Sequence, residues 1–136
     1  MSNAPTKLSP EQKARFLKFK NDIIKQEAER GDFWTFKDGE TRIGRFNGDK
    51  IETDVEIKNK KGEVIASGMT RFYVRELIED EQGNKSWSDK EKRWEVKPAW
   101  AKLVFTRFAE GYFDLRITRE GSGVNDTNYD IIPYFG

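Results

Sequence analysis

The chain contains no cysteine and no histidine among its 136 residues. The lack of cysteine excludes disulfide bonds and thiolate nucleophiles, and the two absences together exclude zinc sites built from these residues. Imidazole, the commonest group for general acid–base catalysis, is missing as well. Carboxylate sites for magnesium and lysine chemistry stay open, but no nucleophile and base stand together in the sequence. We therefore predict that the protein is not an enzyme and has no cofactor and no metal site.

Long apolar runs are also missing. No run approaches the roughly 18 residues of a membrane-spanning helix, and the N-terminus lacks the apolar core of a signal peptide. We expect a soluble cytoplasmic protein with no membrane partner, located in the host cytoplasm if the chain is viral. The sequence leaves open whether Met1–Ala4 is native or a cloning remnant.

Net charge is small, because 25 Lys and Arg are balanced by 24 Asp and Glu to leave +1. A protein that binds duplex DNA by bulk charge is usually strongly basic, so this class is disfavoured. A single-strand binder depends partly on aromatic stacking and tolerates a less basic chain. Aromatic residues make up 13% of the sequence, which is ample for a folded core and argues against disorder.

Residues 9–31 are predicted to form a helix after a loose start over residues 1–8. Ser9 can cap the helix, Pro10 suits its first position, and Gln12 completes a capping box. We expect an apolar stripe of this helix to pack on the sheet, and the alternative is self-association or binding to a protein partner. The stripe consists of Phe16, Phe19, Ile23 and Glu27, broadened by Leu17, Ile24 and Ala28.

Several short strands with glycine turns and one further helix are predicted in residues 32–136. The helix covers 98–110, between Pro98 at its start and Gly111 at its end. The polar stretch 79–93 is expected to be a long, mobile hairpin loop. The predicted strands are 32–36, 40–47, 51–57 after a turn at Gly48-Asp49, 64–78 with a break at Gly68, 94–96, 112–118 and 129–132.

This order of elements predicts a mainly β fold with two helices. The form that we expect is a small oligonucleotide-binding (OB) fold, a five-stranded Greek-key barrel, with an N-terminal helix and a helix before the last hairpin. The alternative is an α+β fold in which two helices cover a twisted antiparallel sheet. The predicted parts of the chain are a flexible start (1–8), the N-terminal helix (9–31) and the OB-like domain (32–136).

The stretch 112–129 combines a strand, a glycine-rich loop and a returning strand, as at a binding edge. Strict alternation directs one set of side chains to the core and the other set to the opposite face. Arg119 beside the loop either contacts phosphate, with backbone amides nearby, or forms a salt bridge to Glu120 or Asp126. The inward set is Phe113, Leu115 and Ile117, and the outward set is Asp114, Arg116 and Thr118.

Alternation in the stretch Arg71–Arg75 places Phe72 and Val74 in the core. Arg71, Tyr73 and Arg75 then share the opposite face, with an aromatic ring between two guanidinium groups. Stacking of a base on an aromatic ring contributes about 1–3 kcal/mol, and arginine can contact phosphate or stack on a base. The alternative is an ordinary solvated strand face.

The sequence leaves open the roles of two further pairs of residues. Trp34 and Phe36 point to one side of an extended segment, where they either enter the core or stack on bases; burial is favoured for at least half of the aromatics there. Arg42 and Arg45 lie on opposite faces of a regular strand, whereas a bulge at Gly44 would bring both to one side.

The polar loop 79–93 contains Trp87, which either stacks on a ligand or caps a nearby apolar patch. The acids of this loop match no metal-binding loop in their spacing. We expect them to form a solvated acidic surface that could repel DNA from one side. These acids are Glu79, Asp80, Glu81 and Glu91.

The stretch Ile117–Tyr129 resembles the C-terminal signature of single-stranded DNA-binding proteins from bacteriophages and related archaeal or viral sequences. The matching residues are Ile117, Thr118, Arg119, Gly121, Gly123, Thr127 and Tyr129. Phe33–Phe46 is similar to the opening strand of that family, and Trp94–Val96 lies where the family often has a Trp-containing strand. The resemblance covers residues 33–47 and 94–133.

The resemblance implies an OB fold, sequence-tolerant binding of single-stranded DNA (or RNA) in replication, recombination or repair, and no catalysis. The N-terminal helix would serve a homo-oligomer or a replication partner. A rival hypothesis is a protein-interaction module, such as a virion or inhibitor protein, which the small net charge favours. The residues predicted to contact nucleic acid are Trp34, Phe36, Arg42, Arg45, Arg71, Tyr73, Arg75, Trp87, Trp94, Arg119 and Tyr129.

Overall fold

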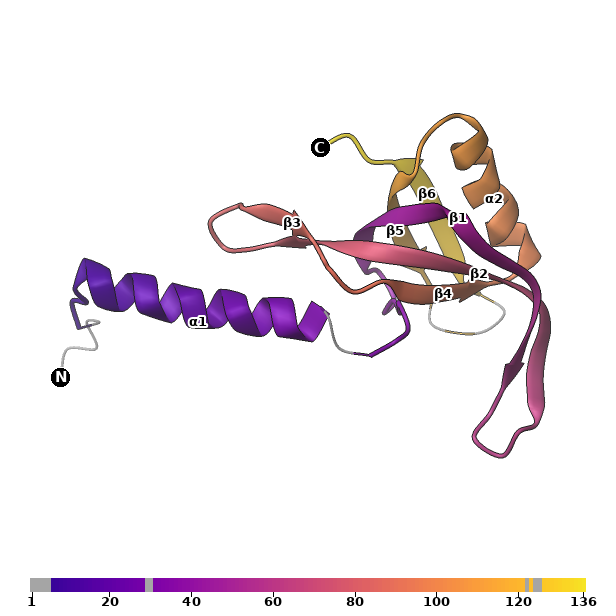
Figure 1. Ribbon diagram of the computed structural model, residues 1–136, viewed down its shortest axis with the longest axis horizontal. Helices are drawn as coiled ribbons and strands as arrows, with labels where there is room; N and C mark the ends of the chain where they lie inside the picture. The colour runs from indigo at the N-terminus through magenta and orange to yellow at the C-terminus, as the bar shows by residue number, and fades with distance from the viewer. Residues whose placement is uncertain (1–5, 29–30, 122, 124–125) are drawn as a thin grey trace.

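The computed structural model describes residues 6–28, 31–121, 123 and 126–136. The protein is mainly β, with an antiparallel sheet and two helices; α2 lies against the sheet, whereas α1 extends away from it (Figure 1). The elements are α1 (Pro10–Ala28), β1 (Thr41–Lys58), β2 (Val64–Glu79), β3 (Lys85–Trp87), β4 (Lys92–Val96), α2 (Pro98–Ala109), β5 (Asp114–Glu120) and β6 (Asn128–Pro133).

The sheet has six strands in the order β3-β2-β1-β5-β6, and β4 also pairs with β2. All strand pairs are antiparallel. The α+β alternative is therefore confirmed in its antiparallel sheet and two helices, although of the two helices only α2 lies against the sheet. The prediction of a barrel is wrong, since no pairing between the described strands joins β4 to β6 and closes the sheet.

The gap between β4 and β6 has a local cause. One edge of β4 pairs with β2, and the opposite edge is partly occupied by the segment that precedes β1. The amide of Trp34 donates to the carbonyl of Arg93 at 2.8 Å, and the amide of Arg93 donates to the carbonyl of Asp32 at 2.8 Å. Because these backbone groups are already satisfied, β6 cannot pair with the same part of β4.

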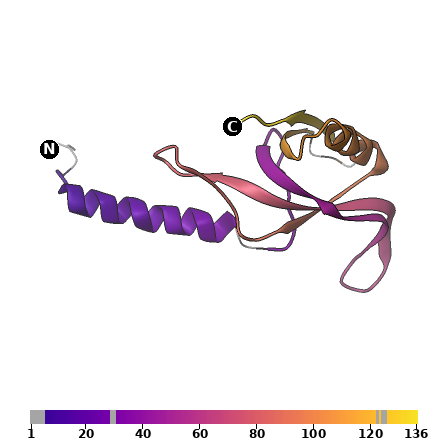
Figure 2. The same ribbon diagram turned by 45° about the horizontal axis from the view of Figure 1, so that its top comes forward.

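The first two strands are longer than the sequence predicts. β1 continues through Gly48-Asp49, where a turn was predicted, and its pairing with β2 shifts register between Phe46 and Ile51. β2 likewise continues through Gly68, whose φ of +68° is one that glycine adopts readily. These glycines therefore lie at irregularities within two long strands and do not form turns. The end of the β1–β2 hairpin extends beyond the rest of the sheet (Figure 2).

Five of the twelve buried apolar residues of the core are aromatic. Trp34 lies between Phe36 and Trp94, with ring centroids 4.7 and 5.7 Å away, in edge-to-face geometry. The inward set predicted for β5 is confirmed at two positions, but Phe113 precedes the strand and is 40% exposed. The buried apolar residues are Trp34, Phe36, Phe46, Phe72, Val74, Trp94, Val96, Ala101, Val104, Leu115, Ile117 and Ile131.

The start of α1 has the predicted capping box: the amide of Gln12 donates to the Ser9 hydroxyl at 3.1 Å, and the Ser9 amide donates to the Gln12 side chain at 3.1 Å. The predicted packing of the apolar stripe is wrong. Phe16, Phe19 and Ile23 are 48%, 54% and 53% exposed. The described contacts of the helix with the body include an ion pair of Lys20 with Glu81 at the β2–β3 hairpin.

The outcome for the side chains of Ile24, Glu27 and Ala28 lies outside the described part of the chain. Helix α2 begins at Pro98 as predicted and ends at Ala109, before Gly111 with its φ of +94°. The stretch 79–93 is not one loop, because it contains β3 and the start of β4. Among the described residues, no helix is long and apolar enough to cross a membrane.

Candidate nucleic-acid interface

One face of the sheet points away from the aromatic core, and we call it the outer face. Alternation places every second side chain of β1, β2 and β5 on it. The register puts Arg45 of β1 opposite Arg75 of β2 on one side and Asp114 of β5 on the other. Arg116 lies two residues further along β5, on the same face and opposite Ile43. The strands therefore bring cations from three distant parts of the sequence to one surface.

A cluster of cations and aromatic rings lies on this face. The guanidinium of Arg45 sits 4.3 Å from the ring centroid of Trp87, which in turn meets Tyr134 edge to face at 6.5 Å. The Lys85 ammonium and the Arg116 guanidinium lie 5.9 and 6.0 Å from the Tyr134 ring. We call these five residues the cation–aromatic cluster. Such contacts are attractive because the ring face is electronegative.

The cluster retains positive charge. Asp114 forms a bidentate pair with Arg45, at 2.9 and 3.0 Å, and so offsets one of its cations. Arg75, beside Arg45, is exposed and has no ion pair with any described residue. Two hollows flank Arg45: one of about 190 Å³ includes Trp87 and Tyr134, and one of about 220 Å³ includes Arg75. The surface therefore offers uncompensated cations beside partly exposed rings.

The predicted face of Arg71, Tyr73 and Arg75 exists, but acids engage much of it. Arg71 donates to Glu52 at 2.8 Å and to Glu95 at 3.0 Å. The Tyr73 hydroxyl donates to Glu52 at 2.5 Å, and this hydrogen bond raises the pKa of Tyr73. Arg75 is thus the residue of this trio that is free to meet phosphate within the described chain.

Three predicted contact residues lie in the core. Trp34, Phe36 and Trp94 are 2%, 6% and 3% exposed, so we leave them out of the proposed interface. Arg42 lies on the opposite side of β1 from Arg45 because pairing is regular at Gly44. Its guanidinium donates to Glu76 at 2.5 Å and to Glu40 at 3.1 Å.

Arg119 and Tyr129 lie together on the inner side of the sheet. The Arg119 guanidinium donates to the carbonyl of Phe36 at 2.6 Å, to that of Gly121 at 3.0 Å and to the Thr127 hydroxyl at 3.3 Å. Arg119 therefore ties the glycine loop to the segment before β1.

The sequence prediction missed three members of the cation–aromatic cluster. Arg116 belongs to the outward set of β5, so its face was predicted while its role was not. Tyr134 follows β6 directly, and Lys85 opens β3 within the stretch 79–93, which the sequence predicts to be a loop. The sequence signal for Lys85 is its position two residues before Trp87, because residues two apart in a strand lie on the same face.

The site and fold together describe a small α+β protein with an open antiparallel sheet and a cation–aromatic surface. Comparison with known proteins adds no relative, since no protein-family model, no curated protein and no solved structure matches the chain.

Proposed function

We propose that the protein binds single-stranded DNA with little sequence preference along the outer face, in replication, recombination or repair. The observation that carries the proposal is the cation–aromatic cluster. Single-stranded nucleic acid needs flat faces for its unstacked bases and cations for its backbone. Trp87 and Tyr134 supply the rings, and Arg45, Lys85 and Arg116 supply cations within about 6 Å of them.

Two further features support the proposal. The net charge of the chain is only +1, but cations concentrate on one face. This local positive surface, and not the total charge, would attract the DNA backbone. The order β4-β2-β1-β5-β6, with α2 between β4 and β5, is compatible with an OB barrel left open between its outermost strands.

The test is titration with oligo-dT at low and high salt, followed by tryptophan fluorescence and by gel shift. Wild-type protein should bind and lose fluorescence, and binding should weaken with salt. Trp87→Ala should weaken binding about tenfold or more, in keeping with about 1–3 kcal/mol per stacked base. Arg15→Gln, which removes a cation from the exposed side of α1, is the matched control and should bind like wild type.

Absence of both a gel shift and a fluorescence change in the wild-type protein would overturn the proposal. Equal affinity of Trp87→Ala and wild type would remove the cation–aromatic cluster from it.

A protein-interaction module is the second candidate, and the exposed stripe of α1 is the observation that favours it. Phe16, Phe19 and Ile23 each expose about half of their surface on one side of the helix. Solvent-exposed apolar groups of this size at i, i+3 and i+7 are typical of helices that dock on a partner. Size-exclusion chromatography of wild type and of Phe16→Ser/Phe19→Ser tests this candidate, because loss of an oligomer in the variant would favour it.

A further inference from the structure

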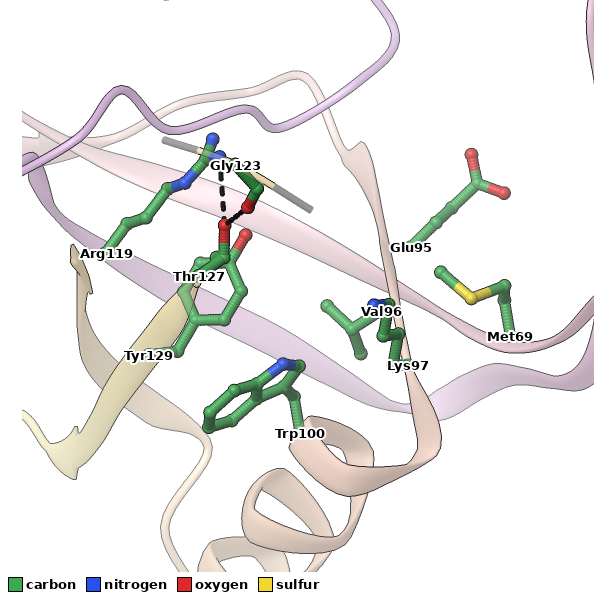
Figure 3. A pocket seen from close by; sticks show the side chains of 9 residues that line it. All are labelled: Met69, Glu95, Val96, Lys97, Trp100, Arg119, Gly123, Thr127 and Tyr129. Atoms are coloured by element: carbon green, nitrogen blue, oxygen red, sulfur yellow. Dashed lines mark hydrogen bonds between the residues drawn. The ribbon is translucent and has the colours of Figure 1, made fainter. Parts of the chain in front are cut away.

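A cavity of about 220 Å³ lies on the inner side of the sheet, at the gap between β4 and β6 (Figure 3). We infer that this cavity binds a single nucleobase. It is lined by parts of β2, β4, β5 and β6, by the first turn of α2, and by Gly123 and Thr127 before β6. The choice of a nucleobase rests on the proposed function, whereas the shape and chemistry of the cavity do not.

Two aromatic side chains form one wall of the cavity. Trp100 of α2 and Tyr129 of β6 meet edge to face, with ring centroids 5.5 Å apart, and both are half-buried. Neither the indole N–H of Trp100 nor the hydroxyl of Tyr129 has a hydrogen-bond partner among the described residues. Burial raises the pKa of Tyr129, so its hydroxyl stays protonated and can donate at neutral pH. The wall thus combines flat apolar surface with two polar atoms that lack partners.

An unpaired strand edge forms the facing side. Arg93 of β4 directs its N–H and C=O to the segment Asp32–Trp34, on the edge away from β2. Glu95, two residues further on, directs its backbone groups to the same edge, where no described strand pairs with it. Glu95 also lines the cavity. A donor and an acceptor of the backbone therefore face the aromatic wall.

This combination suits a nucleobase better than a purely apolar ligand. A base extruded from its strand is held by stacking or edge contact with aromatic groups and by hydrogen bonds to its Watson–Crick edge. An apolar ligand would leave the Trp100 N–H, the Tyr129 hydroxyl and the Glu95 backbone unsatisfied, at a cost. The rim adds Lys97 and Arg119, whose positive charge suits the phosphate that accompanies the base.

The test follows the four indole N–H signals by NMR while thymidine monophosphate or adenosine monophosphate is added to the full-length protein. The Trp100 signal should shift and saturate, and the Trp87 signal should move less. Tyr129→Phe should weaken this binding about three- to tenfold, because it removes one hydrogen bond. The protein should fold normally, since the hydroxyl bonds no described residue. Tyr112→Phe makes the same chemical change outside both the cavity and the cation–aromatic cluster and should bind like wild type.

Three outcomes would overturn the inference. The first is that the Trp100 signal does not move with either nucleotide, and the second is that it moves equally in wild type and Tyr129→Phe. The third is that Tyr112→Phe loses as much affinity as Tyr129→Phe. The inference and the proposed function fail separately. If oligo-dT binds without moving the Trp100 signal, the cavity is not a base site and the outer face stands. If monophosphates bind at Trp100 but oligo-dT does not bind, the proposed binding of single-stranded DNA is wrong and the assignment of the cavity as a base site is kept.

Discussion

Gly44 is the point at which a missing side chain lets the core close. A Cβ atom built there would clash with Val74 and would lie 3.1 Å from the Trp34 ring. Both neighbours are buried and cannot move aside cheaply. We predict that Gly44→Ala lowers the free energy of unfolding by about 1–3 kcal/mol, the usual cost of overpacking. Urea unfolding followed by tryptophan fluorescence measures this change.

Gly48 provides the control for that substitution. A Cβ atom there would meet the ring of Phe113 at 2.5 Å, but this ring is 40% exposed and can rotate into solvent. Gly48→Ala should therefore cost clearly less than Gly44→Ala. An equal loss in the two variants would show that the contact with Trp34 and Val74 is not what makes glycine necessary.

Lys92 is a buried cation, only 6% exposed, and forms no hydrogen bond or ion pair with the described residues. Burial lowers its pKa, although Glu76 nearby favours the charged form. The folded state therefore holds an ammonium that is better solvated when the chain is unfolded. We predict that Lys92→Met raises the free energy of unfolding at pH 7 by about 1 kcal/mol, because methionine occupies similar volume without charge.

The advantage of Lys92→Met should shrink in alkaline solution. The folded-state pKa of Lys92 lies below its ordinary value of 10.5, so between these two values the unfolded chain binds more protons than the folded protein. Wild-type stability then rises with pH in that window, relative to the variant. Urea midpoints of both proteins at pH 7 and pH 10 measure the effect, and a difference that does not change with pH would contradict it.

Helix α1 contributes little to the stability of the sheet. Its ion pair with Glu81 joins two largely exposed side chains, and the described aromatic residues of its stripe, Phe16 and Phe19, are about half exposed. We predict that Phe16→Ser/Phe19→Ser changes the free energy of unfolding by less than about 0.5 kcal/mol. Phe72→Ala, in the core, should cost about 3–5 kcal/mol. Fluorescence-detected urea unfolding separates these cases because no tryptophan lies in α1: Trp34 is in the core, Trp87 and Trp94 are in strands, and Trp100 is in α2. A large loss in the double variant would show that α1 packs on the body.

The same elements show what a sequence can predict locally. Alternation gave the buried faces of β2 and β5 correctly, because period two is a property of the strand itself. It did not give where β5 begins, so Phe113 was assigned to the core although it lies outside and stacks on Phe108 at 4.8 Å. The turn predicted at Gly48-Asp49 failed for a related reason. Gly48-Asp49 lies in an irregularity of β1 between Phe46 and Ile51, and pairing with β2 resumes at Ile51; local turn propensity does not include the pairing on either side.

At the scale of the whole molecule, the sequence could not predict which strands become neighbours. The open sheet depends on Asp32–Trp34 occupying one edge of β4, a contact between segments about sixty residues apart. The cation–aromatic cluster likewise joins β1, β3, β5 and the residue after β6. Arg45 and Trp87 were both predicted contact residues, but only the register of the sheet places them together. The acidic residues that bond Arg71 and Tyr73, and so compete with phosphate for them, also come from other strands.

The salt dependence of binding follows from the charge that the whole outer face presents. Arg45, Arg75, Lys85 and Arg116 supply four cations, of which Arg45 is offset by Asp114. Three to four phosphate contacts to a single strand predict that log K falls with log salt with a slope of about −2 to −3.

Arg75→Gln should reduce the magnitude of the slope by about 0.7, the contribution of one phosphate contact. Arg71→Gln, whose cation is already held by Glu52 and Glu95, should leave the slope almost unchanged. Titrations with oligo-dT between 50 and 200 mM salt, roughly the range over which such slopes are measured, decide the matter. Equal slopes for wild type and Arg75→Gln would place the DNA backbone away from the outer face.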